Sequence, residues 1–447
     1  MFWRKKLPDS QTIFAPASAV GKAGVTIFRI SGAEATQAVT RLCVPRELPA
    51  PRLATLRDIK DLNSGEVIDH ALILYFPAPH SFTGEDVIEL HTHGGRAVTN
   101  AVIAALRALP HFRLAEAGEF TRRAFENGKM DLTEAEAIAD LVHAETEAQR
   151  KQALRQMDGA LGKLYEDWRH RLSHSLAYVE AAIDFSDEEL PEDMIEKQSA
   201  ALRILRDEIL NHLNDNHRGE RLREGFSIAI LGPPNAGKSS LLNALARREA
   251  AIVSPTAGTT RDVIEVHLDI GGYPVILADT AGLRAANDSI ESEGVRRAHL
   301  RAADADLKLI VLDGTSSSPD EFVRDLIDAN TIVVLNKSDI ANVANTKKDS
   351  LPISALTGSG IDDLLQKLAQ EIAHRFDATS APPLTRARHR AALEECVENL
   401  ARALQAQQVD MCAEDIRLAM RALGRITGRI DVEDLLDIIF RDFCIGK

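Results

Sequence analysis

Short apolar runs separated by polar turns recur through the middle of the chain and predict buried strands. Each is too short for an ordinary helix, and they occupy residues 226–231, 275–278 and 331–335. Apolar positions at helical spacing follow the first run at 240–246 and return at 361–376. Strands that alternate with helices indicate an α/β unit. We therefore predict a doubly wound, Ras-like sheet within residues 222–378.

The first 124 residues show shorter, alternating patterns and predict a small mixed α/β domain. Strand-like segments lie at 12–15, 24–30, 71–76 and 87–91, and helix-like segments at 33–43 and 96–109. Arg29 and Glu89 are charges among apolar neighbours in two of these strands, so they are either solvent-face residues or part of a ligand site. His91 and His93 share a strand face and form a candidate metal pair, although no third ligand is apparent.

Helical spacing dominates the two regions that flank the α/β unit, residues 125–221 and 379–447. These regions predict a single all-α domain in two parts, with the α/β unit inserted between them. A capping-box pattern at 133–136 begins one long amphipathic helix, whose apolar stripe runs through Leu141 and Leu161 to Leu176. Further expectations are a solvated acidic loop at 184–196, a helix at 200–213 and a helix break at 426–428.

The sequence GPPNAGKS at residues 232–239 joins the first predicted strand to a helix and has the spacing of a phosphate-binding loop. Gly232 and Gly237 let the backbone wrap a phosphate, and the N–H groups at the helix start face the anion. Lys238 supplies a positive charge to the β- and γ-phosphates, and Ser239 supplies a hydroxyl to Mg²⁺. The loop therefore predicts a nucleotide site.

Three further motifs decide between ATP and GTP. In GTTRD at 258–262, Thr260 is a second candidate for Mg²⁺, and in DTAG at 279–282 the aspartate and the Gly282 N–H face the metal and the γ-phosphate. In NKSD at 336–339, the Asp339 carboxylate can accept two N–H bonds from guanine, which adenine cannot offer. The backbone at 354–356 would meet guanine O6. The predicted GTP set is Gly232, Asn235, Ala236, Gly237, Lys238, Ser239, Ser240, Thr260, Asp279, Thr280, Ala281, Gly282, Asn336, Lys337, Asp339, Ser354, Ala355 and Leu356.

Leu283 follows the DTAG motif, where many small GTPases carry a glutamine that orients the attacking water. A leucine cannot orient water, so another group must do so. The acidic stretch at 287–293 offers Glu291 and Glu293, of which Glu293 fits a solvated helix start.

Length and composition limit the number of domains, the compartment and the partners that we expect for this chain. Its 447 residues allow about two to four domains. With no run of 18 apolar residues and no secretory signal, we expect a cytoplasmic protein without a membrane span. The net charge of −14 disfavours broad binding to nucleic acid but permits a local basic surface. The chain has four cysteines, Cys43, Cys396, Cys412 and Cys444. They lack C-x-x-C spacing, which indicates reduced thiols.

Several segments together resemble the tRNA modification GTPase MnmE (TrmE) family. They are SFTGED at 81–86, GEFTRR at 118–123 with NGK at 127–129, GTTRD at 258–262, and the terminal CIGK at 444–447. The resemblance spans essentially the whole chain and preserves the order of the motifs. Two departures are the first histidine of HTHGG at 91–95 and the WRKK stretch at 3–6, which has no counterpart that we can place.

The resemblance implies three domains and a shared reaction. Residues 1–124 would dimerise and bind 5-formyl-tetrahydrofolate or a related tetrahydrofolate, with the helical domain and inserted GTPase following. With an MnmG-type FAD- and NADH-dependent partner in a heterotetramer, the homodimer would add an aminomethyl or carboxymethylaminomethyl group at C5 of the wobble uridine of certain tRNAs. By motif, the folate contacts would be Arg29, Glu89, Lys129 and Lys447.

The resemblance also implies potassium in place of an arginine finger, whose charge is worth ~10³–10⁵ in rate elsewhere. The implied K⁺ ligands, which join the GTP set, are Asn235, Ser254, Thr256 and Thr259, in a site completed when two GTPase domains dimerise. Glu291 matches the water-orienting glutamate of the family and, with Lys238, is a catalytic candidate. The resemblance also implies a part for Cys444 in the tRNA chemistry. The alternative is that Cys444 is an ordinary terminal thiol.

Two other functions are compatible with parts of the pattern. A nucleotide-switched ribosome-assembly GTPase would share the GTP motifs, but such proteins usually add a basic RNA-binding domain, which is not apparent here. A folate-dependent one-carbon enzyme is the third possibility, and folate binding without tRNA modification would support it.

Overall fold

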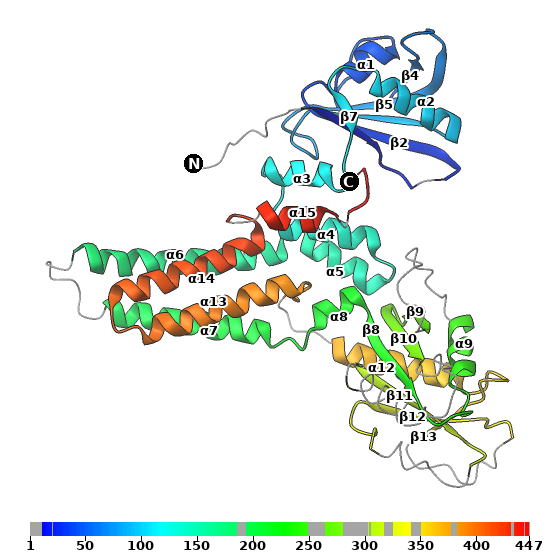
Figure 1. Cartoon of the computed structure of the whole chain (residues 1–447), viewed down its shortest axis with the longest axis vertical. Coiled ribbons are helices and arrows are strands. Elements are labelled where there is room, and N and C mark those ends of the chain that lie inside the picture. The colour runs from blue at the N-terminus through cyan, green and yellow to red at the C-terminus, as the bar shows by residue number, and fades with distance from the viewer. Residues whose placement is uncertain are drawn as a thin grey trace, which may run out of the picture. The chain divides into compact units, whose positions relative to one another are not determined.

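A computed structural model gives the fold of the chain (Figure 1). It describes residues 11–19, 21–185, 194–248, 264–279, 303, 305–316, 325–340, 350–376, 382–430, 433–441 and 443–446. The chain divides into two compact units. Unit 1 holds Met1–Ala139, Gly162–Tyr165 and Gly424–Lys447, and unit 2 holds Asp140–Leu161 and Glu166–Leu423.

Unit 1 is built on a seven-stranded sheet, drawn in blue to cyan in Figure 1. Its strand order is β3 (Cys43–Val44), β4 (Thr55–Lys60), β5 (Val67–Phe76), β6 (Val87–Gly94), β2 (Ala23–Ser31), β1 (Thr12–Pro16) and β7 (Phe112–Leu114). Neighbours pair antiparallel except β1 and β7, which are parallel. This sheet confirms the mixed α/β domain and adds three strands, β3, β4 and β7, that the sequence pattern did not predict.

Two helices, α1 (Gln37–Leu42) and α2 (Arg96–Arg107), complete the core of this sheet. Phe14, Phe28 and Leu90 from the strands are fully buried in one cluster with Val39 of α1 and Leu106 of α2. Along β5, the buried Ala71 and Ile73 alternate with more exposed neighbours, whereas Phe14 of β1 lies between Ile13 and Ala15, which are buried in a separate cluster with Phe120. Helix α1 starts at residue 37, four residues later than the pattern predicted.

The remaining helices of unit 1 bring distant parts of the chain together. Helices α3 (Glu119–Glu126) and α15 (Glu433–Arg441) are in contact, and Leu132, at the start of α4 (Leu132–His143), shares a buried cluster with Phe440 and Phe443. Helix α14 (Val409–Thr427) ends at Gly428, whose φ of 84° is a left-handed conformation suited to glycine. The break expected at 426–428 is therefore confirmed.

Unit 2 contains a six-stranded sheet, drawn in green to yellow in Figure 1. Its order is β13 (Ser350–Pro352), β12 (Thr331–Asn336), β11 (Leu307–Asp313), β8 (Phe226–Leu231), β10 (Tyr273–Asp279) and β9 (Ile264–Ile270). All neighbours are parallel except β9 and β10. The predicted α/β fold is confirmed, including the last helix, α12 (Ile361–Phe376).

Both faces of this sheet are buried, which explains why its strands are continuous apolar runs. Along β8, Ile228 and Ile230 belong to a cluster with α9 (Lys238–Arg248) and α12, while Ala229 and Leu231 belong to a second cluster with Leu326. The carboxyl ends of the parallel strands therefore form one edge, where ligands of such sheets bind.

The single long helix predicted from residue 133 onward is wrong. Three helices replace it, namely α4, α5 (Glu147–Met157) and α6 (Ala160–Asp184). A capping box formed by Thr146 and Gln149 starts α5, and Gly159, at φ 77°, lies between α5 and α6. The stripe residues Leu161 and Leu172 are buried in α6, whereas α5 buries Gln152, Ala153 and Gln156, so the predicted stripe does not continue through α5 as an apolar face.

The capping box expected at 133–136 is also displaced. Asp131 Oδ1 accepts a hydrogen bond from the Glu134 N–H at 2.9 Å, and Glu134 Oε2 accepts from the Asp131 N–H at 2.8 Å. Thr133 instead donates its hydroxyl to Asp131. An aspartate therefore caps α4 two residues before the predicted threonine.

Further helices flank the six-stranded sheet in sequence. They are α7 (Met194–Leu213), α8 (Arg218–Glu224), α13 (Ala387–Gln405) and α14. Helix α7 starts at Met194, six residues before the expected helix. Met194 belongs to the segment 184–196 that was predicted as an acidic loop. Residues 186–193 of that segment lie outside the described part. Helix α8 was not expected. Helices α7 and α13 pack together, so the chain leaves the bundle for the sheet and returns to it.

Ion pairs fix the two chain segments that lead into and out of the sheet. Asp140 accepts hydrogen bonds from Arg223 at 3.2 Å and from Arg386 at 2.7 Å, which joins α8 to the start of α13. Asp140 and Arg386 are mostly buried, where such a pair is screened little by solvent. Among the described helices, none is long and apolar enough to cross a membrane.

The buried histidine of α7 makes the stability of the bundle depend on pH. His212 packs edge-on against Trp168 with ring centroids 5.4 Å apart. Burial lowers the pKa of His212 to about 4, with Asp215 opposing this shift and Arg390 assisting it. Above the unfolded pKa of about 6.5, the imidazole is neutral in both states. Below it, the unfolded state takes up a proton that the folded state does not, so stability falls with pH until about pH 4.

We expect up to about 2 kcal/mol of unfolding free energy to be lost through His212 between pH 7 and pH 5. The measurement is urea unfolding followed by Trp168 fluorescence in a Trp3→Phe background. His212→Gln should reduce this loss, whereas His174→Gln, an exposed histidine variant on α6, should not. An unchanged pH dependence in His212→Gln would show that the histidine is not its source.

Candidate functional site

The phosphate-loop residues form a closed turn between β8 and α9. Gly232 has φ 144°, and a Cβ at this position would lie 2.1 Å from the Val311 carbonyl oxygen. Gly237 has φ 90°, and a Cβ there would lie 2.2 Å from Asn336 Nδ2. Asn235 is exposed and also takes a left-handed conformation, at φ 62°. The two glycines are therefore required by close approach as well as by backbone angle.

Lys238 reaches back over this turn. Its Nζ donates to the carbonyl oxygens of Gly232 at 2.9 Å and Pro233 at 2.8 Å, and the residue is 8% exposed. The ammonium group thus lies at the loop, where it can serve phosphate oxygens. Ser239 and Ser240 follow in the first turn of α9 with exposed side chains. The structure brings these predicted residues together.

A buried asparagine joins the phosphate loop to the predicted base-binding loops. Asn336 is 3% exposed at the end of β12. Its Nδ2 donates to the Ala236 carbonyl at 2.9 Å, and its Oδ1 accepts from the Ala355 N–H at 3.0 Å. One side chain therefore connects three motifs, of which the first lies 100 residues before Asn336 and the last 19 residues after it.

The loops at the predicted guanine side are held by local hydrogen bonds. The Ser338 N–H donates to the Ile353 carbonyl at 3.0 Å, which ties the NKSD segment to the next loop. Ser354 is fully buried, and its hydroxyl oxygen accepts from the Thr357 N–H. Asp339 is exposed, so its carboxylate is accessible to a ligand. The Leu356 side chain is 88% exposed. The predicted role at Leu356 belongs to its backbone.

Asp313 is a residue of this region that the sequence pattern missed. It ends β11 beside Asn336, and its Oδ2 lies 2.5 Å from Lys337 Nζ. Burial opposes ionisation, but hydrogen bonds from Lys337 and Thr315 hold its pKa at about 2. The available signal was an acid at the end of the apolar run 307–312, the same pattern that singled out Asp279.

Part of the predicted site lies outside the described residues. Asp279 is seen as the last backbone position of β10, paired with Ile230 and Ile264, and its side chain is not described. The predicted residues outside the description are Ser254, Thr256, Thr259, Thr260, Thr280, Ala281, Gly282, Glu291, Glu293 and Lys447. The magnesium, potassium and water-orienting assignments that depend on them stay predictions.

A second polar group lies on the sheet of unit 1. Arg29 of β2 and Glu89 of β6 face each other in register, and Nε and Nη2 of Arg29 both donate to Glu89 Oε1 at 3.1 Å. The guanidinium lies 5.3 Å from the ring centre of Phe82 and 5.9 Å from that of Phe120. The charged pair is mostly buried and lies near two aromatic rings, so it does not lie on an open solvent face, and its part in ligand binding stays a prediction.

Lys129 approaches the same segment from the other side. Its Nζ donates to the Pro79 carbonyl at 3.0 Å, and a Cβ added to Gly84 would lie 3.3 Å from its Cδ. Asn127 Nδ2 donates to the Thr83 carbonyl at 2.8 Å. The segment at 79–86 therefore contacts Lys129 through Pro79, Asn127 through Thr83 and Arg29 through Phe82.

The C-terminal segment also lies in this part of unit 1. The Gly118 N–H donates to the Cys444 carbonyl at 3.4 Å, and Ile445 forms a strand-like bridge with Ala117. A Cβ on Gly446, which has φ 104°, would lie 2.3 Å from the carbonyl oxygen of Pro16, the last residue of β1. The Cys444 side chain is exposed. These contacts anchor the end of the chain against β1, the strand that pairs with the one carrying Arg29.

The candidate metal pair in β6 is wrong. His91 Nε2 lies 3.3 Å from Glu89 Oε2, whereas His93 Nδ1 lies 2.7 Å from Asp69 Oδ1. Each imidazole therefore has its own carboxylate. Within the described ranges, no group of three or more His, Cys, Asp or Glu side chains could hold a metal ion.

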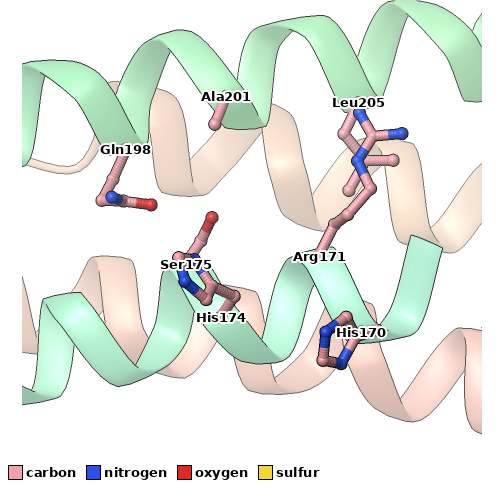
Figure 2. A pocket seen from close by; sticks show the side chains of 7 residues that line it. All are labelled: His170, Arg171, His174, Ser175, Gln198, Ala201 and Leu205. Atoms are coloured by element: carbon pink, nitrogen blue, oxygen red, sulfur yellow. The ribbon is translucent and has the colours of Figure 1, made fainter. Parts of the chain in front are cut away.

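A cavity of about 280 Å³ lies between α6 and α7 (Figure 2). Arg171, which lines it, is held by Glu208 through hydrogen bonds of 2.6 and 3.0 Å. No residue predicted for GTP, metal or folate lines this cavity. Its lining residues are His170, Arg171, His174, Ser175, Gln198, Ala201 and Leu205.

Two protein families match nearly the whole chain. Residues 132–444 match the family described as "MnmE helical domain", and residues 12–129 match "GTP-binding protein TrmE N-terminus". The "tRNA modification GTPase MnmE" of Parvibaculum lavamentivorans is 57% identical over 98% of this chain and 100% of its own length. The chain belongs to the MnmE family of tRNA modification GTPases.

Other MnmE-family relatives extend the likeness. The "tRNA modification GTPase MnmE" of Paramagnetospirillum magneticum is 56% identical over 98% of this chain and all of its own length. The human mitochondrial "5-taurinomethyluridine-[tRNA] synthase subunit GTPB3" is 47% identical over 98% of this chain and 93% of its own length. The resemblance drawn from the sequence motifs is confirmed.

The bridge made by Asn336 gives a direct test of the nucleotide site in this MnmE-family chain. Asn336→Ala leaves the Ala236 carbonyl and the Ala355 N–H without this partner, at a cost of about 1–3 kcal/mol. We expect fluorescent GDP to bind at least about tenfold more weakly, because both loops lose their shared support. Asn330→Ala is the control, since that exposed amide accepts only from Arg375 among the hydrogen bonds described. Equal GDP affinities in the two variants would contradict the bridging role.

Proposed function

We propose that this chain hydrolyses GTP to drive modification of the wobble uridine in certain tRNAs. With a flavin-dependent partner of the MnmG type, it adds an aminomethyl or carboxymethylaminomethyl group at C5. The observation that carries the proposal is the joining of a closed phosphate loop to the NKSD and Ser354–Leu356 loops through Asn336, in a chain of this family.

The names of the relatives support the same class of product. The human relative is named as a subunit of a 5-taurinomethyluridine-[tRNA] synthase, so its product carries a substituted methyl group on a tRNA uridine. The word subunit in that name supports a partner protein in the reaction. We infer an MnmG-type FAD-dependent protein for this chain, in a heterotetramer with its homodimer.

The nucleotide would lie at the carboxyl ends of β8, β11 and β12. Lys238 would give its ammonium to the β- and γ-phosphates, and Ser239, exposed in the first turn of α9, would give a hydroxyl to Mg²⁺. Asp339 would accept two N–H bonds from guanine. Thr260 and Asp279 would complete the magnesium surroundings.

A potassium ion would supply the charge that an arginine finger supplies in other GTPases. Asn235 fits this role because its left-handed backbone places an exposed amide side chain on the phosphate loop. Oxygens of Ser254, Thr256 and Thr259 would join it when two GTPase domains meet. Glu291 would orient the attacking water in place of Leu283.

We also infer a tetrahydrofolate site in unit 1. The Arg29 guanidinium suits the glutamate carboxylates of a folate, the Glu89 carboxylate can accept N–H bonds from a pterin, and the partly exposed Phe82 would offer a ring face. Lys129 and the terminal Lys447 would add positive charge. Cys444, exposed beside Gly118, would lie close to this site and take part in the tRNA chemistry.

The cation mechanism is tested by GTP hydrolysis in potassium and sodium chloride at matched ionic strength. We expect potassium to accelerate hydrolysis by at least about tenfold, because it replaces a finger charge worth ~10³–10⁵. Asn235→Ala should lose this acceleration while still binding GDP. Equal rates of the wild-type protein in the two salts would remove the potassium proposal.

The tRNA reaction is tested with the same variants and a purified MnmG-type partner. Undermodified tRNA is incubated with both proteins, and its nucleosides are analysed by mass spectrometry. Wild type should produce a C5-substituted wobble uridine, and Asn235→Ala should produce far less. GTP hydrolysis without any modified uridine would favour the ribosome-assembly type of switch instead.

The folate proposal is tested by calorimetry with 5-formyl-tetrahydrofolate. Glu89→Gln keeps the side-chain shape but loses the charge, so binding should weaken by at least about tenfold. The control is Asp58→Asn, because Asp58 is a carboxylate of the same sheet that pairs with His70 across β4 and β5 and is not a predicted folate contact. An equal affinity in both variants would show that Glu89 does not contact the folate.

A further inference from the structure

Asp313 lies at the carboxyl end of β11, and both of its carboxylate oxygens accept hydrogen bonds. It ends β11 in register with Asn336, the last residue of β12. Its Oδ1 accepts from the Thr315 N–H at 2.9 Å and from the Thr315 hydroxyl at 2.6 Å. Its Oδ2 accepts from Lys337 Nζ at 2.5 Å. The Gly314 N–H donates to the Asn336 carbonyl at 2.8 Å, so the turns after the two strands are bound to each other.

Lys337 is consequently fixed at both of its ends. Its backbone has φ 65° and lies between Asn336 and the Ser338 N–H that bonds to the Ile353 carbonyl. Its ammonium group is held by Asp313. The aliphatic stem therefore reaches from the end of β12 to the end of β11, and both side chains are only partly exposed.

The position of this stem relates it to the nucleoside. Strand β11 lies between β12, which leads to the NKSD loop, and β8, which leads to the phosphate loop. A nucleotide with its phosphates on the loop after β8 and its base at Asp339 must pass its ribose and base across the end of β11. Lys337, stretched over this interval, presents its stem and ammonium to that part of the ligand.

We propose that Asp313 is a positioning residue for the guanine nucleotide, acting by holding Lys337 across the end of β11. This inference rests on the proposed GTP binding. Without the carboxylate, the four-carbon stem of Lys337 gains rotamer freedom that binding must remove again. Because Asp313 is tied to the base-side loop, its loss should affect GDP and GTP alike.

Asp313→Asn isolates this effect. The amide oxygen still accepts both bonds from Thr315, which preserves the turn, while the amide NH₂ cannot accept from the Lys337 ammonium. We expect fluorescent GDP and a non-hydrolysable GTP analogue to bind roughly fivefold more weakly, as the loss of one partly exposed ion pair permits. The kcat at saturating GTP should stay within about twofold of the wild-type value, since the reacting phosphate is not involved.

A matched control lies at the opposite end of the same two strands. Asp328 accepts from Lys308 Nζ at 2.7 Å, from the Thr331 hydroxyl at 2.9 Å and from the Asn330 N–H at 2.9 Å. Asp328→Asn thus removes a similar ion pair on the same sheet, before β12 begins. It should leave the affinity for both nucleotides unchanged, although it alters the thermal unfolding of the protein as much as Asp313→Asn does.

A double-mutant cycle with Lys337→Ala completes the test. If Asp313 acts through Lys337, the double variant should bind GDP no more weakly than Lys337→Ala alone. Wild-type affinity in Asp313→Asn, equal losses in Asp313→Asn and Asp328→Asn, or additive losses in the cycle would each overturn the inference. A wild-type protein that binds no guanine nucleotide would overturn the proposed function as well, so the two failures are distinguishable.

Discussion

The bridge made by the buried side chain of Asn336 is the interaction on which the nucleotide edge of the sheet depends. Its amide donates to the Ala236 carbonyl and accepts from the Ala355 N–H, so it uses both of its polar atoms inside the protein. An aspartate could not donate and a leucine could not do either, whereas an asparagine satisfies both loops at once. The phosphate loop and the base-side loops are therefore positioned together rather than separately.

The glycines of the phosphate loop follow from the same closeness. Gly237 leaves room for the Asn336 amide, and Gly232 leaves room for the Val311 carbonyl of the neighbouring strand. Lys238 then lies over the loop with its ammonium on two of its carbonyl groups. A nucleotide would meet a loop that is already shaped, so little of its binding energy would be spent on ordering the backbone.

Unit 1 is organised in a comparable way around contacts between distant segments. The Cys444–Gly446 stretch touches Ala117, Gly118 and Pro16, and the segment at 79–86 contacts Lys129 through Pro79 and Arg29 through Phe82. A charged pair between β2 and β6 lies near aromatic rings and is mostly buried, so its attraction is screened less than that of a surface pair. Residues from the beginning and the end of the chain thus come together on one part of this unit.

The sequence by itself determined the apolar strands, the phosphate loop and the NKSD motif, because residue spacing and apolar character are local properties of the chain. It did not locate the helix ends at Thr146 and Gly159, since a stripe of apolar residues continues across short interruptions. Nor did it show that Asp313 serves Lys337, or that His91 and His93 face different carboxylates. These were decided by the tertiary structure, because strand register sets which side chains of remote segments lie within hydrogen-bond distance.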